Sequence, residues 1–223
     1  MKKPKLAIIH TTSVTVDSLK TLAAEVMPEW DIINFVDDSI LPQLAANGGR
    51  IEEVQERWSA YARFAEQQGA ACVVSACSSV GEAAEAARLE VGVPVKRIDE
   101  AMAEEAVTLG GTIGVAATLA STLGPTIRLI ERKAQAAGKT IDIKQGLASE
   151  AYRLLMSGDR EGHDRVLADM LLKLVEEADI VVLAQASMAR VVSSLPEELR
   201  AKFLTSPRLG LTRIAREMAA PAG

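Results

Sequence analysis

Residues 73–82 of this chain read Val-Val-Ser-Ala-Cys-Ser-Ser-Val-Gly-Glu. The apolar run at 70–74 predicts a buried strand, and a turn of small residues that carries Cys77 follows it. A helix is expected to begin around Gly81. In an open α/β sheet, ligands bind at the carboxyl ends of the strands, and helix N-termini there attract anions. A thiol at that point is the strongest chemical feature of this chain.

The composition indicates a globular protein and argues against two classes of partner. The chain has 223 residues, of which 48% are hydrophobic and 25% charged, enough for one large domain or two small ones. The net charge is −5, and this acidic balance does not suggest the basic face that nucleic-acid binding usually needs. No apolar run approaches the ~20 residues of a membrane span, and the basic N-terminus precedes too short an apolar stretch for a signal peptide. We therefore expect a cytoplasmic protein with neither a nucleic-acid nor a membrane partner.

The two cysteines, Cys72 and Cys77, are expected to differ in role. Their spacing matches no zinc or Cys-x-x-Cys motif, and geometry disfavours a disulfide across a strand end. Reduced thiols fit a cytosolic protein, and no metal site is expected. Cys72 is predicted to be buried in the strand, whereas Cys77 is the candidate reactive thiol.

Strand and helix patterns alternate along the whole chain. Strands are predicted at 5–10, 31–36, 70–74, 95–98, 112–117, 140–144, 179–184 and 203–205. Helices are predicted at 16–26, 51–68, 82–89, 99–109, 124–137, 149–157, 159–178, 188–201 and 208–218. The stretch 41–50, with Pro42 and Asn-Gly-Gly, predicts a loop. The alternation predicts an α/β fold in which helices flank mostly parallel sheets.

The two halves of the chain also resemble each other. Residues 6–13 align with 114–121, and residues 73–79 align with 181–187 without gaps. A duplicated unit predicts two pseudo-symmetric lobes with an active-site cleft between them. The expected division is residues 1–98 plus 207–223 for the first lobe, which carries Cys77, and residues 99–206 for the second, which carries Gln185.

On these residues the chain resembles the aspartate/glutamate/hydantoin racemase superfamily over nearly its whole length. The resemblance rests on Cys77-Ser78-Ser79, Pro94 to Met102, Ile113 to Thr118 with Ser121, Val181 to Ala184, and Ser206-Pro207, in this order and spacing. It implies a two-lobed fold with the site between the lobes, no metal and no cofactor. It also implies a homodimer or a higher homo-oligomer.

The resemblance further implies catalysis by two cysteines, one in each lobe. One thiolate removes the proton from the α-carbon of the substrate, and the other thiol returns a proton to the opposite face. Cys77 occupies the first of these positions, but Gln185 occupies the second, and an amide has no titratable proton. Cys72 cannot replace the missing thiol because it lies in the same strand as Cys77.

These residues favour a cofactor-independent isomerase or lyase that acts on a small carboxylate through one cysteine, by proton transfer at the α-carbon or by a covalent thiol adduct. One alternative is an amino-acid or hydantoin racemase or epimerase with a non-standard second base. Another is a non-catalytic protein that binds small acids.

Several further residues are candidates for holding the substrate. Hydroxyl and backbone N–H groups suited to a carboxylate occur at Thr11, Thr12, Ser78, Ser79, Thr118, Ser121, Thr122 and Ala186, and helix capping is the alternative role. Gln185 is either a donor to a carboxylate or enolate oxygen, or a residue of an inactive site. His10 is either an acid or base, or a structural histidine. His163 and the glutamate-rich runs at 82–90 and 100–105 are expected to be solvated.

Overall fold

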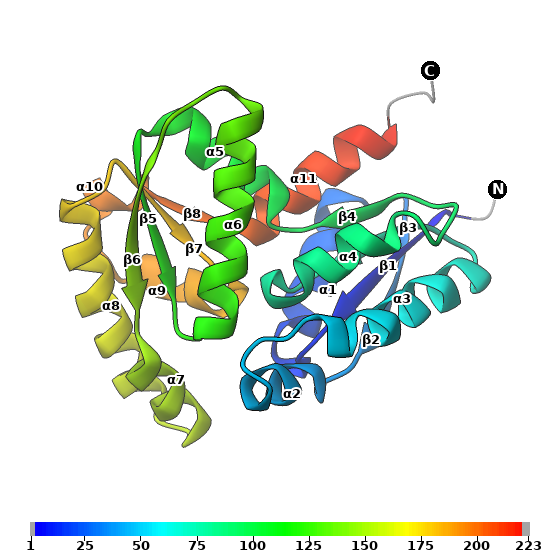
Figure 1. Ribbon diagram of the computed structural model, residues 1–223, viewed down its shortest axis with the longest axis horizontal. Helices are drawn as coiled ribbons and strands as arrows, with labels where there is room; N and C mark the ends of the chain where they lie inside the picture. The colour runs from blue at the N-terminus through cyan, green and yellow to red at the C-terminus, as the bar shows by residue number, and fades with distance from the viewer. Residues whose placement is uncertain (1–2, 220–223) are drawn as a thin grey trace. The chain divides into compact units, whose positions relative to one another are not determined.

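The computed structural model describes residues 3–219, which form two compact units, each built on its own sheet (Figure 1). The first unit contains the chain up to Asp99 together with the segment from Pro207 onward, and the second contains Glu100–Ser206. Asp99, expected in the second lobe from the sequence, lies in the first unit, where it pairs with Arg97. Both units combine a parallel sheet with flanking helices, as the α/β prediction requires.

The sheet of the first unit has four parallel strands in the order β2-β1-β3-β4. Its strands are β1 (Lys5–His10), β2 (Asp31–Val36), β3 (Ala70–Ser75) and β4 (Val95–Arg97). Its helices are α1 (Val16–Val26), α2 (Ile40–Ala46), α3 (Glu52–Gln67), α4 (Gly81–Ala87) and α11 (Ser206–Ala219), with 3-10 turns η1 (Ser13–Thr15) and η2 (Ser78–Val80). Because all four strands run the same way, their carboxyl ends lie along one edge of the sheet.

Two helical layers cover the faces of this sheet. Ala7 and Ile9 of β1 pack in one apolar cluster with residues of α3 and α4. Leu6 and Ile8 of the same strand pack in another cluster, with residues of α1 and α11. Successive side chains of a strand point to opposite faces, so this alternation produces a core on each side.

The second unit repeats the same strand order, β6-β5-β7-β8, and is again parallel throughout. Its strands are β5 (Thr112–Ala117), β6 (Asp142–Leu147), β7 (Ile180–Leu183) and β8 (Phe203–Thr205). Its helices are α5 (Glu100–Leu109), α6 (Ala120–Ala136), α7 (Ser149–Met156), α8 (Arg160–Glu176), α9 (Ala189–Val192) and α10 (Glu197–Arg200), with the 3-10 turn η3 (Ala186–Met188). Figure 1 shows α6 and α8 on opposite faces of this sheet.

Four local predictions were wrong or misplaced. The predicted loop at 41–50 contains α2, because Ile40 and Leu44 are buried on one side of it and Pro42 lies in the first turn, where the helix needs no N–H. The predicted helix at 188–201 is instead the separate short helices α9 and α10, interrupted at Pro196, whose backbone is extended. Strand β6 lies at 142–147 rather than 140–144, and α6 begins at Ala120 rather than Gly124.

A search of the described helices for a membrane span found none that combines the length and the apolar character needed to cross a bilayer.

Candidate active site

Cys77 lies just beyond the carboxyl end of β3, at the start of the turn η2. Its backbone is extended, with φ −132° and ψ 124°, and its carbonyl accepts a hydrogen bond from the hydroxyl of Ser75 at 3.4 Å. The side chain is half-buried, and both cysteines are free thiols. The sheet therefore presents a partly accessible thiol at the edge where parallel sheets bind their ligands.

Gln185 occupies the corresponding position in the second unit. It follows β7 and precedes η3, as Cys77 follows β3 and precedes η2. Its backbone, with φ −128° and ψ 132°, differs from that of Cys77 by less than about 10° in each angle. Within their own units, the two residues occupy equivalent turns, in agreement with the ungapped alignment of the two segments.

Two hydrogen bonds fix the amide of Gln185. Its Oε1 accepts from the backbone N–H of Thr118 at 2.6 Å and from the hydroxyl of Thr118 at 2.9 Å. A backbone N–H can only donate, so the oxygen of the amide must face Thr118. The two N–H groups of the amide remain to donate elsewhere, whereas the hydroxyl proton of Thr118 is already used. Gln185 is therefore a hydrogen-bond donor held in place by Thr118.

The other predicted hydroxyl residues of the first unit have different environments. Thr11 follows β1 and is 2% exposed, and its hydroxyl has no hydrogen-bond partner among the described residues. Thr12 caps η1, since its hydroxyl accepts from the N–H of Val14 at 3.3 Å, which is the capping alternative. Ser78 and Ser79 are both buried in the turn after Cys77. The structure thus gathers these residues and Cys77 at the carboxyl edge of one sheet.

In the second unit, the candidates gather at the carboxyl edge of its own sheet. Thr118 follows β5, and Ser121 and Thr122 lie in the first turn of α6. Ala186 opens η3 directly after Gln185. The binding roles of Ser79, Ser121, Thr122 and Ala186 stay predictions.

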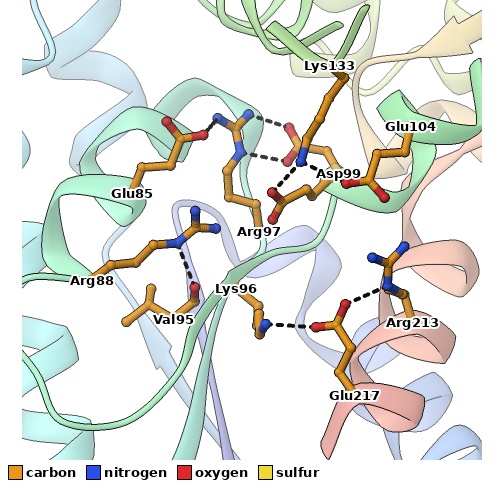
Figure 2. A network of polar contacts seen from close by, with 11 residues as sticks. Glu85, Arg88, Val95, Lys96, Arg97, Asp99, Glu104, Lys133, Arg213 and Glu217 are labelled. Atoms are coloured by element: carbon orange, nitrogen blue, oxygen red, sulfur yellow. Dashed lines mark hydrogen bonds and ion pairs between the residues drawn. The ribbon is translucent and has the colours of Figure 1, made fainter. Parts of the chain in front are cut away.

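A buried ion pair beside the Cys77 turn was not predicted as part of the site (Figure 2). Arg97 and Asp99 are only 2% and 1% exposed. Arg97 donates from Nε to Oδ1 and from Nη2 to Oδ2 of Asp99, both at 2.9 Å, and from Nη1 to Glu85 at 2.7 Å. Residues two apart in an extended segment share a face, so the pattern Arg97-Ile98-Asp99 around a buried isoleucine was the available signal.

Both members of this pair are charged. Burial alone would raise the pKa of Asp99, but the charge and hydrogen bonds of Arg97, together with a hydrogen bond from Ser78, hold that pKa below its ordinary value. Burial opposes the charge of Arg97 too, yet Asp99 and Glu85 outweigh it and raise the pKa of Arg97. A desolvated pair of this kind persists because its members satisfy each other.

His10 is a structural histidine in this fold. It is fully buried, with Nε2 at 2.9 Å from Oδ1 of Asn34 and Nδ1 at 3.3 Å from the hydroxyl of Thr15. Burial lowers the pKa of His10 below its ordinary value, and the hydrogen bond to Asn34 offsets this only in part. The ring is therefore neutral at pH 7 and enclosed by protein groups.

The expectation that His163 is solvated was wrong. It is buried in α8, and its Nδ1 lies 2.6 Å from Oδ1 of Asp164 and 3.2 Å from Nη2 of Arg190. Asp164, next to His163, forms an ion pair with Arg190 of α9. This ion pair explains why the sequence around a buried histidine is polar.

The glutamate-rich runs are also less solvated than expected. Glu90, in the turn after α4, pairs with Arg63 of α3. Lys133 of α6 binds Glu100 and Glu104 of α5, at 2.6 and 2.8 Å. Figure 2 shows its contact with Glu104. These glutamates form ion pairs with neighbouring helices, a role that helical periodicity alone does not distinguish from a solvated face.

Cys72 matches its predicted burial. It lies within β3 in the apolar cluster that includes Leu6 and Ile8. Burial raises the pKa of the Cys72 thiol to about 12, so the thiol is protonated at neutral pH. It is therefore unsuited to react, which leaves Cys77 as the candidate reactive thiol.

Comparison with known proteins identifies the family. The family model described as Asp/Glu/Hydantoin racemase matches residues 7–214. The chain belongs to this family. A search of curated proteins found no match. Membership of this family supports an isomerase or racemase function.

Solved racemases share the fold of this family member at low sequence identity. A glutamate racemase isoform from Bacillus anthracis superposes with a TM-score of 0.76 at 18% identity, over 98% of this chain and 82% of that one. An aspartate racemase from Picrophilus torridus gives 0.70 at 13% identity, over 96% and 94%. An allantoin racemase from Klebsiella pneumoniae gives 0.61 at 18% identity, over 97% and 87%. The family match gives no support to the lyase alternative.

Proposed function

We propose that the protein is a cofactor-independent isomerase that acts on a small carboxylate, with Cys77 as its single catalytic thiol. Family membership supports the isomerase activity. The observation that carries the finer proposal is the pair of equivalent turns, one with a half-buried thiol and the other with an amide whose oxygen is occupied by Thr118. The proposed substrate is a carboxylate because the candidate residues offer neutral donors suited to its oxygens.

The proposed chemistry begins with proton transfer at the α-carbon. The thiolate of Cys77 takes the α-proton, and the electron pair of the C–H bond moves into the carboxylate to form an enediolate. The N–H groups of Gln185 are suited to stabilise a negative oxygen of this kind. Returning a proton to carbon collapses the enediolate and regenerates the free carboxylate.

Gln185 cannot supply that returning proton, because an amide does not ionise near neutral pH. If the proton comes back from Cys77, it returns to the face that it left. Inversion needs a proton on the other face from a different donor, for which water is the proposed source. The hydroxide that this leaves is neutralised by the proton held on Cys77, which restores the thiolate. A reaction by this route incorporates solvent hydrogen at the α-carbon.

The test is α-proton exchange in deuterated water over a panel of amino, hydroxy and dicarboxylic acids. We expect the wild type to incorporate deuterium into one class of acid, and Cys77→Ala to reduce the rate by at least about 100-fold. Cys72→Ala is the matched control, because it removes a buried thiol and is expected to retain the activity. Retained exchange in Cys77→Ala would show that the thiol has no catalytic role.

The same assay separates the alternatives. A thiol adduct formed on an unsaturated acid gives isomerisation without deuterium at the α-carbon, together with a mass increase on Cys77. Exchange accompanied by inversion shows that a donor other than Cys77, either water or a non-standard second base, returns the proton to the opposite face. If the wild type turns over no acid and Cys77 resists iodoacetamide at pH 7–8, the protein is a non-catalytic binder and the proposal is wrong.

A further inference from the structure

The ion pair Arg97–Asp99 contacts the Cys77 turn on both sides. Asp99 accepts a hydrogen bond from the side chain of Ser78, the residue next to Cys77. Arg97 binds Glu85, which lies in α4 beyond the turn. Figure 2 shows Arg97 lying between Glu85 and Asp99. The segment from Ser78 to Glu85 is therefore tied at each end to the same buried pair.

Because Gly81 has no side chain, the guanidinium of Arg97 lies directly against the backbone of this segment. A Cβ atom at position 81 would lie 2.2 Å from Cζ of Arg97, closer than any side chain could tolerate. Gly81 is the first residue of α4 and is buried. The close approach makes Arg97 a direct support for the start of that helix.

Stability alone does not account for a charged pair in this place. Removing two charges from water is costly, and apolar residues of similar volume often serve equally well or better at a buried position. What the pair offers is a fixed orientation, because two parallel hydrogen bonds hold the guanidinium and the carboxylate in one geometry.

We propose that Arg97 and Asp99 are positioning residues that fix the thiol of Cys77 through Ser78 and the start of α4. This inference rests on the proposed role of Cys77 as the catalytic thiol. Asp99 directs the hydroxyl of Ser78, so the proton of that hydroxyl serves the turn rather than the substrate. Without the pair, the turn is free to move, and a displacement of about 1 Å at a catalytic group can cost about 100-fold in rate.

The experiment replaces both charges together by Arg97→Met/Asp99→Leu, so that no single buried charge is left without its partner. Two measurements are made: the rate of Cys77 alkylation by iodoacetamide, followed by mass spectrometry, and the steady-state parameters on the acid found by the exchange panel. We expect kcat to fall by about 10- to 100-fold with KM little changed, because a mispositioned thiol affects the transition state more than substrate binding. The alkylation rate is expected to rise several-fold, because a loosened turn exposes the half-buried thiol.

A matched control removes another ion pair that begins on the same strand. Lys96→Met/Glu217→Leu eliminates the bridge from β4 to α11, which is 2.7 Å long and does not contact the Cys77 turn. It is expected to keep wild-type kcat and alkylation rate. Cys72 reports on the fold, since a single adduct per chain shows that the buried thiol stays protected. If iodoacetamide labels both cysteines of Arg97→Met/Asp99→Leu, the fold of that variant is disturbed. The positioning role is then decided by the same two measurements on Ser78→Ala, which removes only one hydroxyl.

The outcomes distinguish the two proposals. If Cys77→Ala keeps its turnover, the proposed function fails whatever the pair does. If Cys77→Ala is inactive while Arg97→Met/Asp99→Leu and Ser78→Ala match the wild type in both kcat and alkylation rate, the positioning role is wrong. Should the panel yield no substrate, unchanged alkylation in these variants overturns the inference on its own.

Discussion

The two hydrogen bonds from Thr118 determine what the side chain of Gln185 is able to do. Thr118 is 4% exposed, so its backbone N–H has little access to water and relies on the oxygen of Gln185. A residue at position 185 that cannot accept a hydrogen bond leaves this donor unsatisfied. The cost of such a loss is about 1–3 kcal/mol. Gln185 therefore has a structural role besides any role in chemistry.

We expect Gln185→Leu to lower the free energy of unfolding by about 1–3 kcal/mol, because Leu has a similar volume but no acceptor. Gln185→Glu is the matched control, since a carboxylate keeps an oxygen for the N–H and hydroxyl of Thr118, and it should lose much less. Urea denaturation with an unchanged m-value measures the difference. Equal losses in both variants would mean that the contact with Thr118 is not what holds position 185.

At the scale of secondary structure, α8 depends on a side-chain cap at its first turn. Asp159 precedes the helix, and its Oδ1 accepts from the N–H of Gly162 at 2.8 Å. A Cβ atom on residue 162 would lie 2.3 Å from Oδ2 of Asp159, so this cap fits because residue 162 is glycine. Leu167, Leu171 and other residues of α8 supply much of one core of the second unit. The stability of this core is therefore coupled to the start of the helix.

Asp159→Ala is expected to destabilise the protein by about 1 kcal/mol, the usual cost of losing a helix cap. Asp159→Asn keeps an oxygen that accepts from the N–H of Gly162, so its loss of stability should be only a small part of that seen in Asp159→Ala. Thermal denaturation of the two variants side by side makes the comparison. If the alanine and asparagine variants melt together, the cap contributes nothing and α8 is held by packing alone.

For the whole molecule, the sequence predicted the layers better than the contacts between distant residues. Parallel sheets follow from short apolar runs that alternate with amphipathic helices, and the equivalence of Cys77 and Gln185 follows from an ungapped alignment. The bond between Thr118 and Gln185 joins residues 67 positions apart, and no local pattern predicts it. Charged residues such as Arg97 are normally exposed, so the spacing of Arg97 and Asp99 indicates that they share a face but not that the pair is buried.

The C-terminal helix shows why chain order does not decide which core a helix serves. Helix α11 directly follows β8 of the second unit, yet Leu211 and Ile214 of this helix pack with Leu6 and Ile8 of the first unit. Helix α5, which follows β4 of the first unit, contacts α6 of the second instead. Each sheet is thus completed by a helix that follows the other sheet in sequence.

This exchange predicts where a cavity in α11 weakens the protein. Leu211→Ala should cost about 2–5 kcal/mol, because the removed side chain is fully buried. Hydrogen exchange should then lose protection in β1 and β3, whose residues Leu6 and Val74 share its cluster. The matched variant Leu171→Ala in α8, also fully buried, should lose protection in β5 and β7, where Ala116 and Val181 share its cluster.

The two profiles must differ for the assignment to hold. If α11 served the sheet that precedes it in sequence, Leu211→Ala would expose β8 and β7 and leave β1 protected. Loss of protection in both sheets to the same extent, from either variant, would mean that the protein opens only as a whole, so that neither core has a local stability of its own. Separate losses, each confined to one sheet, would show that the units open independently and that α11 stabilises the sheet that carries Cys77.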